Sequence, residues 1–245
     1  LGLLFPTAGR LRVLQHSPRH VETKRRIGYL PEDSILYPNL TAEEILQFYG
    51  RLFDLSARER RERIDQLLAM VGLAHARRRL TGEFSKGMAR RIGMAQALIN
   101  DPDLIALDEP TSGLDPVGCR EMKDLIRTLA GRGKTVILSS HLLADVENVC
   151  DRIAILCNGN LIVHGTIREL LEERDRHRLT LASIPADTLN RIVAAIQRDF
   201  HLTPEVDHPT RTLEQFFLDV VDKARKSGVE ASGVEPTKGI APYLA

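Results

Sequence analysis

The sequence predicts an α/β fold with a mostly parallel sheet, a helical subdomain and a small α/β appendage near its C-terminal end. Two observations carry this prediction. Short apolar runs at 27–30, 104–107 and 136–139 have the length and composition of buried strands in a parallel sheet. Between the first two runs, residues 41–100 show only helical periodicity, which indicates a helical block inserted into the sheet domain.

Composition limits the classes of protein that fit. A chain of 245 residues suits one large domain with an appendage. With 34 basic and 33 acidic residues, 4% aromatic residues and no Trp, the chain has no global field or stacking platform for nucleic acid. The three cysteines lack metal-ligand spacing and favour a reduced, cytosolic protein. No apolar run approaches the roughly 18 residues that span a bilayer, so any membrane-spanning part belongs to a partner.

Two carboxylates follow the apolar run Leu104–Leu107 directly, Asp108 and Glu109. Ligands of open α/β sheets bind at the carboxyl ends of strands. Mg²⁺ takes one or two carboxylates together with phosphate oxygens, and a neighbouring carboxylate can orient an attacking water. Asp108 is therefore a candidate metal ligand and Glu109 a candidate general base, whereas acidic caps of a helix N-terminus are the alternative.

The helical block contains two capping boxes, Thr41-x-x-Glu44 and Ser56-x-x-Glu59, and each opens an apolar stripe that we expect to be core. A further helix begins at Ser85 and Gly87. Its free N–H groups and positive dipole end can bind a γ-phosphate, although a simple Ser cap without a ligand is the alternative.

Four motifs together resemble the ATP-binding-cassette (ABC) ATPases in their order and spacing. They are YLPED at 29–33, FSKGM at 84–88, LIALDEPTSGLD at 104–115 and SSH at 139–141. The resemblance covers about residues 1–165 and implies a P-loop NTPase-like ABC ATPase core. It also implies ATP and Mg²⁺ as cofactors, with Asp108 holding the metal and Glu109 and His141 as catalytic residues.

The remaining site residues are also implied by this resemblance. Ser85, Lys86, Gly87 and Met88 stand where the family has its signature motif, usually LSGGQ, so that Lys86 and Met88 are departures. Asp115 ends the D-loop and would couple two sites. Glu32 stands where the family usually has Gln, and a carboxylate can accept but cannot donate a hydrogen bond.

A phosphate loop, G-x-x-x-x-G-K-S/T, is not found between a strand and a helix. The nearest match, TLAGRGKT at 128–135, lacks the first Gly and follows a helix. Because the chain also begins in mid-pattern at Leu1, we expect it to be an N-terminally truncated cassette whose Walker A part lies upstream. We expect this fragment alone to be inactive.

The resemblance also implies an organisation and partners. We expect a nucleotide-binding domain at 1–165 with its helical subdomain at 41–100, an accessory α/β region at 166–226 with a strand at 178–184, and a disordered tail at 227–245. The implied function is the ATP-hydrolysing subunit of an ABC exporter, a cytoplasmic protein peripheral on the inner face of the cell membrane. Its partners would be a transmembrane permease subunit and a second ATP-binding subunit, in a homodimer or heterodimer. A soluble ABC-type ATPase and a non-hydrolysing regulatory cassette remain alternatives.

Overall fold

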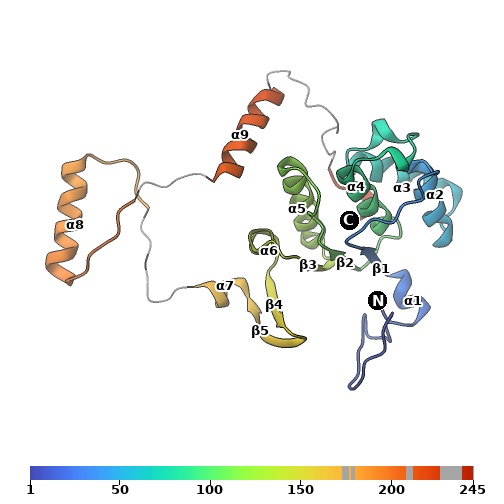
Figure 1. The fold of residues 1–245 in the computed structure, drawn as a ribbon, viewed down its shortest axis with the longest axis horizontal. Coiled ribbons are helices and arrows are strands. Elements are labelled where there is room, and N and C mark those ends of the chain that lie inside the picture. The colour runs from blue at the N-terminus through green and yellow to red at the C-terminus, as the bar shows by residue number, and fades with distance from the viewer. Residues whose placement is uncertain (173–176, 178–179, 208–211, 227–238, 245) are drawn as a thin grey trace. The chain divides into compact units, whose positions relative to one another are not determined.

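The computed structural model describes residues 1–172, 177, 180–207, 212–226 and 239–244 (Figure 1). By internal contacts the chain divides into two units. The first contains Leu1–Cys150 together with Asp222–Ala245, and the second contains Asp151–Val221. The sequence predicts a first domain that extends to residue 165. By internal contacts, residues 151–165 belong to the second unit instead.

A parallel three-stranded sheet forms the centre of the first unit. Its strands β1 (Ile27–Leu30), β2 (Leu104–Asp108) and β3 (Thr135–Ser139) lie in the order β1-β2-β3. Strand β2 is central, and its Ile105 and Leu107 are buried. The helices of this part are α1 (Val21–Arg25), α5 (Pro116–Gly131) between β2 and β3, and α6 (Leu143–Val149) after β3. The fold class predicted from the sequence is confirmed here.

The helical block inserted between β1 and β2 consists of α2 (Ala42–Leu52), α3 (Ala57–Met70) and α4 (Lys86–Leu98). Two short 3₁₀ segments, Ala74–Ala76 and Thr81–Glu83, connect α3 to α4. Both predicted capping boxes are formed, because Thr41 and Ser56 each accept an N–H from the Glu three residues later and each Glu reaches back. The block packs on a continuous core that includes Leu46, Ile64, Leu67, Leu68, Ile92 and Leu98.

The first apolar stripe of this block is only partly core, in contrast to the expectation. Ile45 on α2 is buried, but Phe48 is 46% exposed and Leu52 is 61% exposed. Tyr37 lies edge-on to Phe48, and Phe48 lies edge-on to Tyr49. Part of the stripe therefore forms an exposed aromatic surface.

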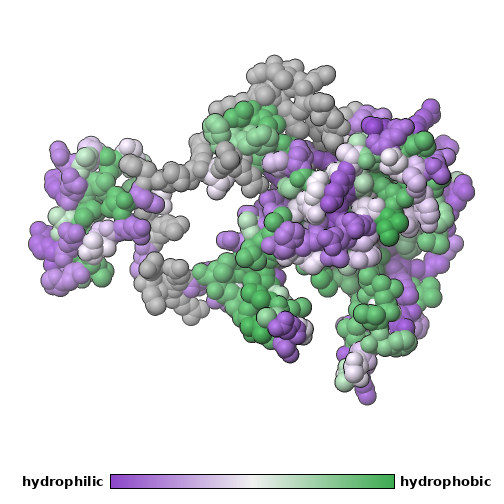
Figure 2. Space-filling model, in the orientation of Figure 1, coloured by the Kyte–Doolittle hydropathy of each residue, from purple (hydrophilic) through white to green (hydrophobic). Residues whose placement is uncertain are grey.

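The second unit begins with an antiparallel hairpin of β4 (Arg152–Cys157) and β5 (Asn160–Thr166). Asn158 and Gly159 both have positive φ, as a two-residue hairpin turn of this kind requires. The helices that follow are α7 (Ile167–Leu171), α8 (Ala186–Phe200) and α9 (Leu213–Lys226). Apolar side chains cover much of the hairpin surface in Figure 2, and Leu156 and Ile162 are more than half exposed.

Two expectations about the C-terminal third need correction. The strand expected at 178–184 is not formed at 180–184, the part of it that the structure describes, and no described strand pairs with these residues. The tail expected to be disordered contains a 3₁₀ turn at Pro242–Leu244. There Leu244 is fully buried and the Tyr243 hydroxyl donates to the carbonyl of Leu98 at 3.0 Å, so apolar burial orders this end of the tail. Residues 227–238 lie outside the described residues.

Among the helices of the described residues, none is long and apolar enough to cross a lipid bilayer.

Candidate functional site

The carboxyl ends of β1, β2 and β3 meet at one edge of the sheet. The register pairs Leu30 with Leu107 and Asp108 with Ser139. The residues just after each strand, which include Glu32, Glu109 and His141, therefore share this edge, where ligands of open α/β sheets bind. The structure thus brings to one edge residues that are far apart along the chain. Glu109 lies 77 positions after Glu32, and His141 lies 109 positions after Glu32.

Glu109 and His141 are in direct contact. One carboxylate oxygen of Glu109 lies 2.9 Å from His141 Nδ1, and the other accepts the main-chain N–H of His141 at 2.8 Å. The Glu109 side chain is 14% exposed and the His141 side chain 70% exposed. A partly desolvated carboxylate held from two directions is oriented to accept a proton from a water, and Nδ1 is engaged, which leaves Nε2 as the ring nitrogen for a ligand.

Asp108 accepts a hydrogen bond from the Ser139 hydroxyl and is half-buried. No group of three or more His, Cys, Asp or Glu side chains in the described residues is arranged to hold a metal ion. Mg²⁺ characteristically uses one or two carboxylates and completes its octahedron with water and substrate phosphates. A single carboxylate at the strand end therefore fits Mg²⁺ that is bound together with a polyphosphate. It does not fit a site in which protein side chains supply all the metal ligands.

Ser85 is the N-cap of α4, where its side-chain oxygen accepts the N–H of Met88 at 3.2 Å. The hydroxyl proton remains a donor for a ligand, so the cap and the phosphate-binding hypothesis are compatible. Lys86 is exposed, but the Met88 side chain is 6% exposed and lies in the core. Burial stabilises this apolar thioether on the inner face of α4, and a contact between Met88 and nucleotide stays a prediction.

The start of α4 lies against the loop 112–115 of the same chain. A Cβ added at Gly87 would lie 3.5 Å from Leu114 Cδ2, and one at Gly113 would clash with the Lys86 side chain at 2.6 Å. Asp115 at the end of this loop caps α5 by accepting the N–H of Gly118 at 3.1 Å. Asp115 thus has a structural task at this helix start, and a role toward a second subunit remains a proposal.

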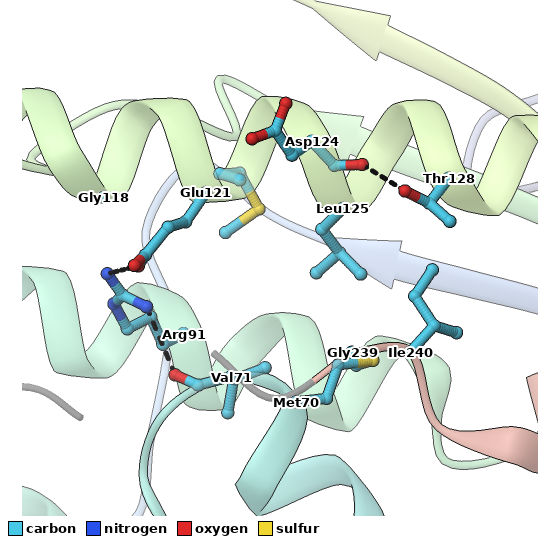
Figure 3. Close-up of a pocket in the computed structure, with 11 residues that line it drawn as sticks. Met70, Val71, Arg91, Gly118, Glu121, Asp124, Leu125, Thr128, Gly239 and Ile240 are labelled. Carbon is cyan, nitrogen blue, oxygen red and sulfur yellow. Dashed lines mark hydrogen bonds and ion pairs between the residues drawn. The ribbon is translucent and has the colours of Figure 1, made fainter. Parts of the chain in front are cut away.

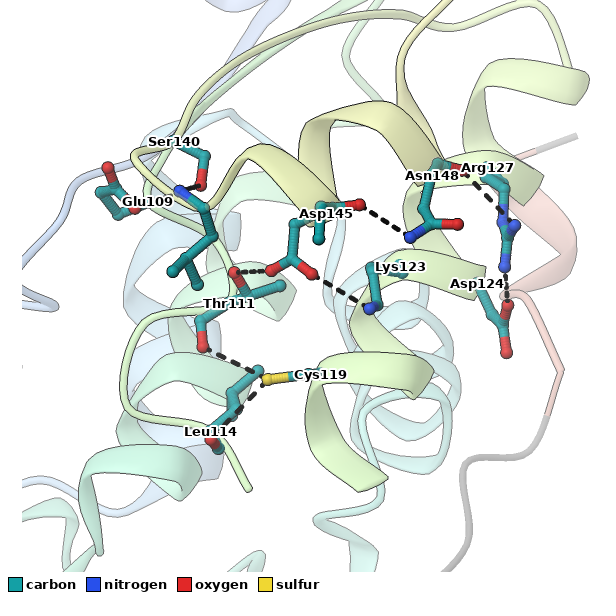
Figure 4. A network of polar contacts seen from close by, with 12 residues as sticks. Glu109, Thr111, Leu114, Cys119, Lys123, Asp124, Arg127, Ser140, Asp145 and Asn148 are labelled. Atoms are coloured by element: carbon teal, nitrogen blue, oxygen red, sulfur yellow. Dashed lines mark hydrogen bonds and ion pairs between the residues drawn. The ribbon is translucent and has the colours of Figure 1, made fainter. Parts of the chain in front are cut away.

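A buried polar network behind Glu109 was not predicted from the sequence (Figure 4). The Thr111 hydroxyl donates to Asp145 at 2.7 Å, and Lys123 Nζ pairs with the other oxygen of Asp145 at 3.0 Å. This network links the loop after Glu109 to α6, the helix that follows His141. A Lys on the apolar face of the α5 helix was the available signal, because a fully buried Lys needs a partner.

Arg90 on α4 is the second group that the sequence did not reveal. Its guanidinium is buried and donates to main-chain carbonyls of both site loops. The available signal in the sequence was a pair of consecutive arginines, Arg90 and Arg91, in an otherwise mostly apolar helix that is buried on almost every side. Buried arginines need polar partners.

A cavity of about 210 Å³ lies elsewhere, between α4, α5 and the C-terminal segment (Figure 3). Met70, Leu125 and Ile240 are among its lining residues, whereas Asp108, Glu109 and His141 are not. The cavity and the strand-end site are therefore separate features.

Comparisons with known proteins point to one family. The family model described as ABC transporter matches residues 1–112. An uncharacterised ABC transporter ATP-binding protein of Synechocystis sp. is 41% identical over 201 residues, which are 81% of this chain and 57% of that protein. The daunorubicin resistance ATP-binding protein DrrA3 of Streptomyces coeruleorubidus is 34% identical over 239 residues, 95% of this chain and 75% of that protein.

Solved structures show the same fold. An ATP-binding cassette solved as a dimer in a post-hydrolysis state, with ADP and Pi, has a TM-score of 0.59 and 26% identity, and the match covers 66% of this chain and 75% of that chain. The chain spans little more than half the length of several curated relatives that it matches. The match to DrrA3, which covers 95% of this chain and 75% of that protein, shows that this chain belongs to the family of ABC transporter ATP-binding proteins.

Proposed function

We propose that this chain is part of the ATP-hydrolysing subunit of an ABC exporter, and that hydrolysis takes place at the carboxyl edge of β1, β2 and β3. The contact between Glu109 and His141 is the observation that carries the proposal. Glu109 orients the attacking water and accepts its proton, while His141 steadies Glu109 and presents Nε2 to the γ-phosphate. Asp108 would hold Mg²⁺, and the bound metal would neutralise part of the negative charge on the ATP phosphates.

The other predicted residues have secondary parts in this proposal. Glu32 follows β1 at the same edge, where its exposed carboxylate accepts from a metal-bound water. Ser85, Lys86 and Gly87 at the start of α4 serve the nucleotide of a second ATP-binding subunit, and the main chain of Met88 belongs to the same turn. Asp115 couples the two sites through the α5 helix that it caps.

The permease partner is proposed from an exposed apolar surface next to the site loops. Ile35 is 84% exposed and Tyr37 53% exposed, and both follow Glu32 closely in the chain. Tyr37 contacts Phe48 on α2 edge-on. Such an exposed aromatic patch is typical of a surface that binds a partner protein. Because the patch lies beside the loop that bears Glu32, a movement of the partner would be transmitted to this loop. The protein would thereby be held at the cytoplasmic face of the membrane.

The 245 residues contain no G-x-x-x-x-G-K-S/T, so we propose that they do not hydrolyse ATP on their own. The test is ATP turnover by the purified chain beside its Glu109→Gln variant. Equal background rates are expected, and turnover of the parent above the variant would contradict this part of the proposal.

The role of Glu109 is tested in a chimera that carries a phosphate loop from a relative ahead of Leu1. Glu109→Gln should lower kcat by roughly 10² to 10⁴ and preserve ATP binding, because the amide keeps the shape of the side chain and loses the base. Rates within a few-fold of the parent would exclude Glu109 as the base. Binding without turnover in the parent chimera would instead support a regulatory cassette.

The shared site is tested by mixing Ser85→Arg and Glu109→Gln chimeras. If Ser85 acts on the nucleotide of the other subunit, a mixed dimer has one intact composite site and recovers part of the activity. Absence of recovery in proven mixed dimers, with a single-site control active, would mean that Ser85 does not act across the interface.

A further inference from the structure

Two adjacent arginines of α4 are both buried but have different partners. Arg91 pairs with Glu121 at 2.8 Å and also donates to the carbonyl of Val71, as Figure 3 shows. Arg90, with 2% of its surface exposed, donates instead to main-chain carbonyls of two loops. These carbonyls belong to Pro31, Glu32, Asp108, Glu109 and Pro110.

The guanidinium of Arg90 suits this arrangement because its N–H groups point outward in a rigid planar fork. Burial lowers the pKa of Arg90, and the charges of Asp108, Glu109 and Glu32 oppose that effect. The group remains charged, since an arginine does not lose its proton in proteins. A buried charge of this kind is stabilised by the carbonyl dipoles, so the loops that supply them are held in place.

The most constrained of these carbonyls belongs to Glu109. Its φ of +48° lies in the left-handed region, which is strained for a residue with a Cβ. The carbonyl of Glu109 accepts from Arg90 Nη2 at 2.6 Å, and its N–H donates to the Ser139 carbonyl at 3.0 Å. Because the backbone angle directs the side chain, these two bonds aim the carboxylate at His141.

We propose that Arg90 is a positioning residue that ties the loop after β1 and the loop after β2 to α4, the helix opened by Ser85. It holds Glu109 in its left-handed conformation, so that a displacement of α4 or of the Glu32 loop is transmitted to the Glu109 carboxylate. Arg90 touches neither nucleotide nor water in this scheme. Its effect on hydrolysis rests on the proposed function, whereas its effect on the loop geometry does not.

The first test measures hydrogen exchange of individual main-chain amides in the 245-residue chain. Arg90→Met should speed exchange of the Glu109 and His141 amides by about 10-fold relative to amides in α3, because their acceptors lose a fixed position. Arg91→Met is the matched control, with the same residue change one position along the same helix, and should leave these two amides within about twofold of the parent.

A second variant covers the case in which Arg90→Met does not fold. Arg90→Lys keeps the charge but replaces the planar fork by a single ammonium, which cannot span both loops, so exchange at Glu109 and His141 should again increase. Unchanged exchange at these amides in the folded variants, or an equal increase in Arg91→Met, would overturn the proposal.

The consequence for catalysis is read in the chimera with a phosphate loop. Arg90→Lys should lower kcat by about 10-fold or more and change KM for ATP less, since Glu109 acts on the water rather than on ATP binding. Altered exchange with an unchanged kcat would refute the base role of Glu109 and leave the positioning role intact. Unaltered exchange would refute the positioning role, whatever the kinetics.

Discussion

The helical block buries its apolar residues far more completely than strand β3 or the β4–β5 hairpin does. Leu46, Ile64 and Leu67 in the block are completely buried. In contrast, Ile137 on β3 is 60% exposed, and Leu156 on the hairpin is 68% exposed. Both regions are apolar in sequence, so hydrophobicity alone does not explain the difference.

The difference reflects where each kind of element finds its partners. A helix satisfies its main-chain hydrogen bonds internally, and the three helices of the block bury apolar residues in a continuous core that also includes Leu30, Ile105 and Ile126. A strand needs a neighbour on each side. Within the described chain, β3 pairs with β2 on one side only, and β4 and β5 pair only with each other. We therefore expect the block to be the stable part of the molecule and the strand edges the weak part.

The largest effect is expected from a cavity in the block. Leu68→Ala should lower the free energy of unfolding by about 3 kcal/mol, because Leu68 is 1% exposed and its neighbours cannot collapse into the space. Urea unfolding followed by circular dichroism measures this loss. A loss below about 1 kcal/mol would show that the block is loosely packed.

A smaller effect is expected at the helix caps. Ser56→Ala removes the cap of α3 and should cost about 1 kcal/mol in the same urea experiment. Thr166→Ala removes an equivalent capping box from α7, a helix of 5 residues in the hairpin unit. Since that cap supports little packed structure, its removal should cost clearly less, and equal losses would break the comparison.

The block should also lose stability in acid. The hydrogen bond from Arg77 lowers the pKa of Glu43 below its ordinary value of 4.5. The pair therefore stabilises the fold fully at pH values above 4.5, and this contribution is lost as the pH falls through the lowered pKa. At pH 6, Glu43→Gln should cost roughly 0.5 kcal/mol, and the difference from the parent should shrink below pH 4.5. Glu62→Gln, in the exposed pair with Arg58, is the control and should have a smaller effect.

The smallest effect is expected on the hairpin surface. Leu156→Lys should change the free energy of unfolding by less than about 0.5 kcal/mol, because the side chain is already mostly in water. A loss of about 2 kcal/mol or more would mean that the hairpin surface is packed in solution, and the contrast between the two regions would fail.

Local patterns predicted most of the elements. The strands predicted at 27–30, 104–107 and 136–139 are present to within one residue at either end, and both predicted capping boxes are formed. Each of these depends on side-chain period or caps within a few positions. The strand-end placement of Asp108, Glu109 and His141 followed from the same patterns.

Features that depend on distant contacts were not predictable in this way. Arg90 lies 58 positions after Glu32, and Tyr243 lies 145 positions after Leu98, to which it is hydrogen-bonded. Nothing near Arg90 in the sequence shows that it meets two loops, and the composition around Tyr243 resembles a solvated tail. The burial of Met88 was likewise not predicted, because its motif position does not show which face of α4 is buried.

The open side of β3 has a consequence for the protein in concentrated solution. Its TVILS segment is β-branched and apolar, contains no proline, and presents main-chain donors and acceptors that β2 does not use. Such an edge is a template for intermolecular strand pairing, in which a second molecule adds its own apolar strand. Lys134, which would discourage this as an exposed charge, is instead engaged with Asp101. Light scattering should therefore increase with protein concentration, and Ile137→Lys should suppress that increase.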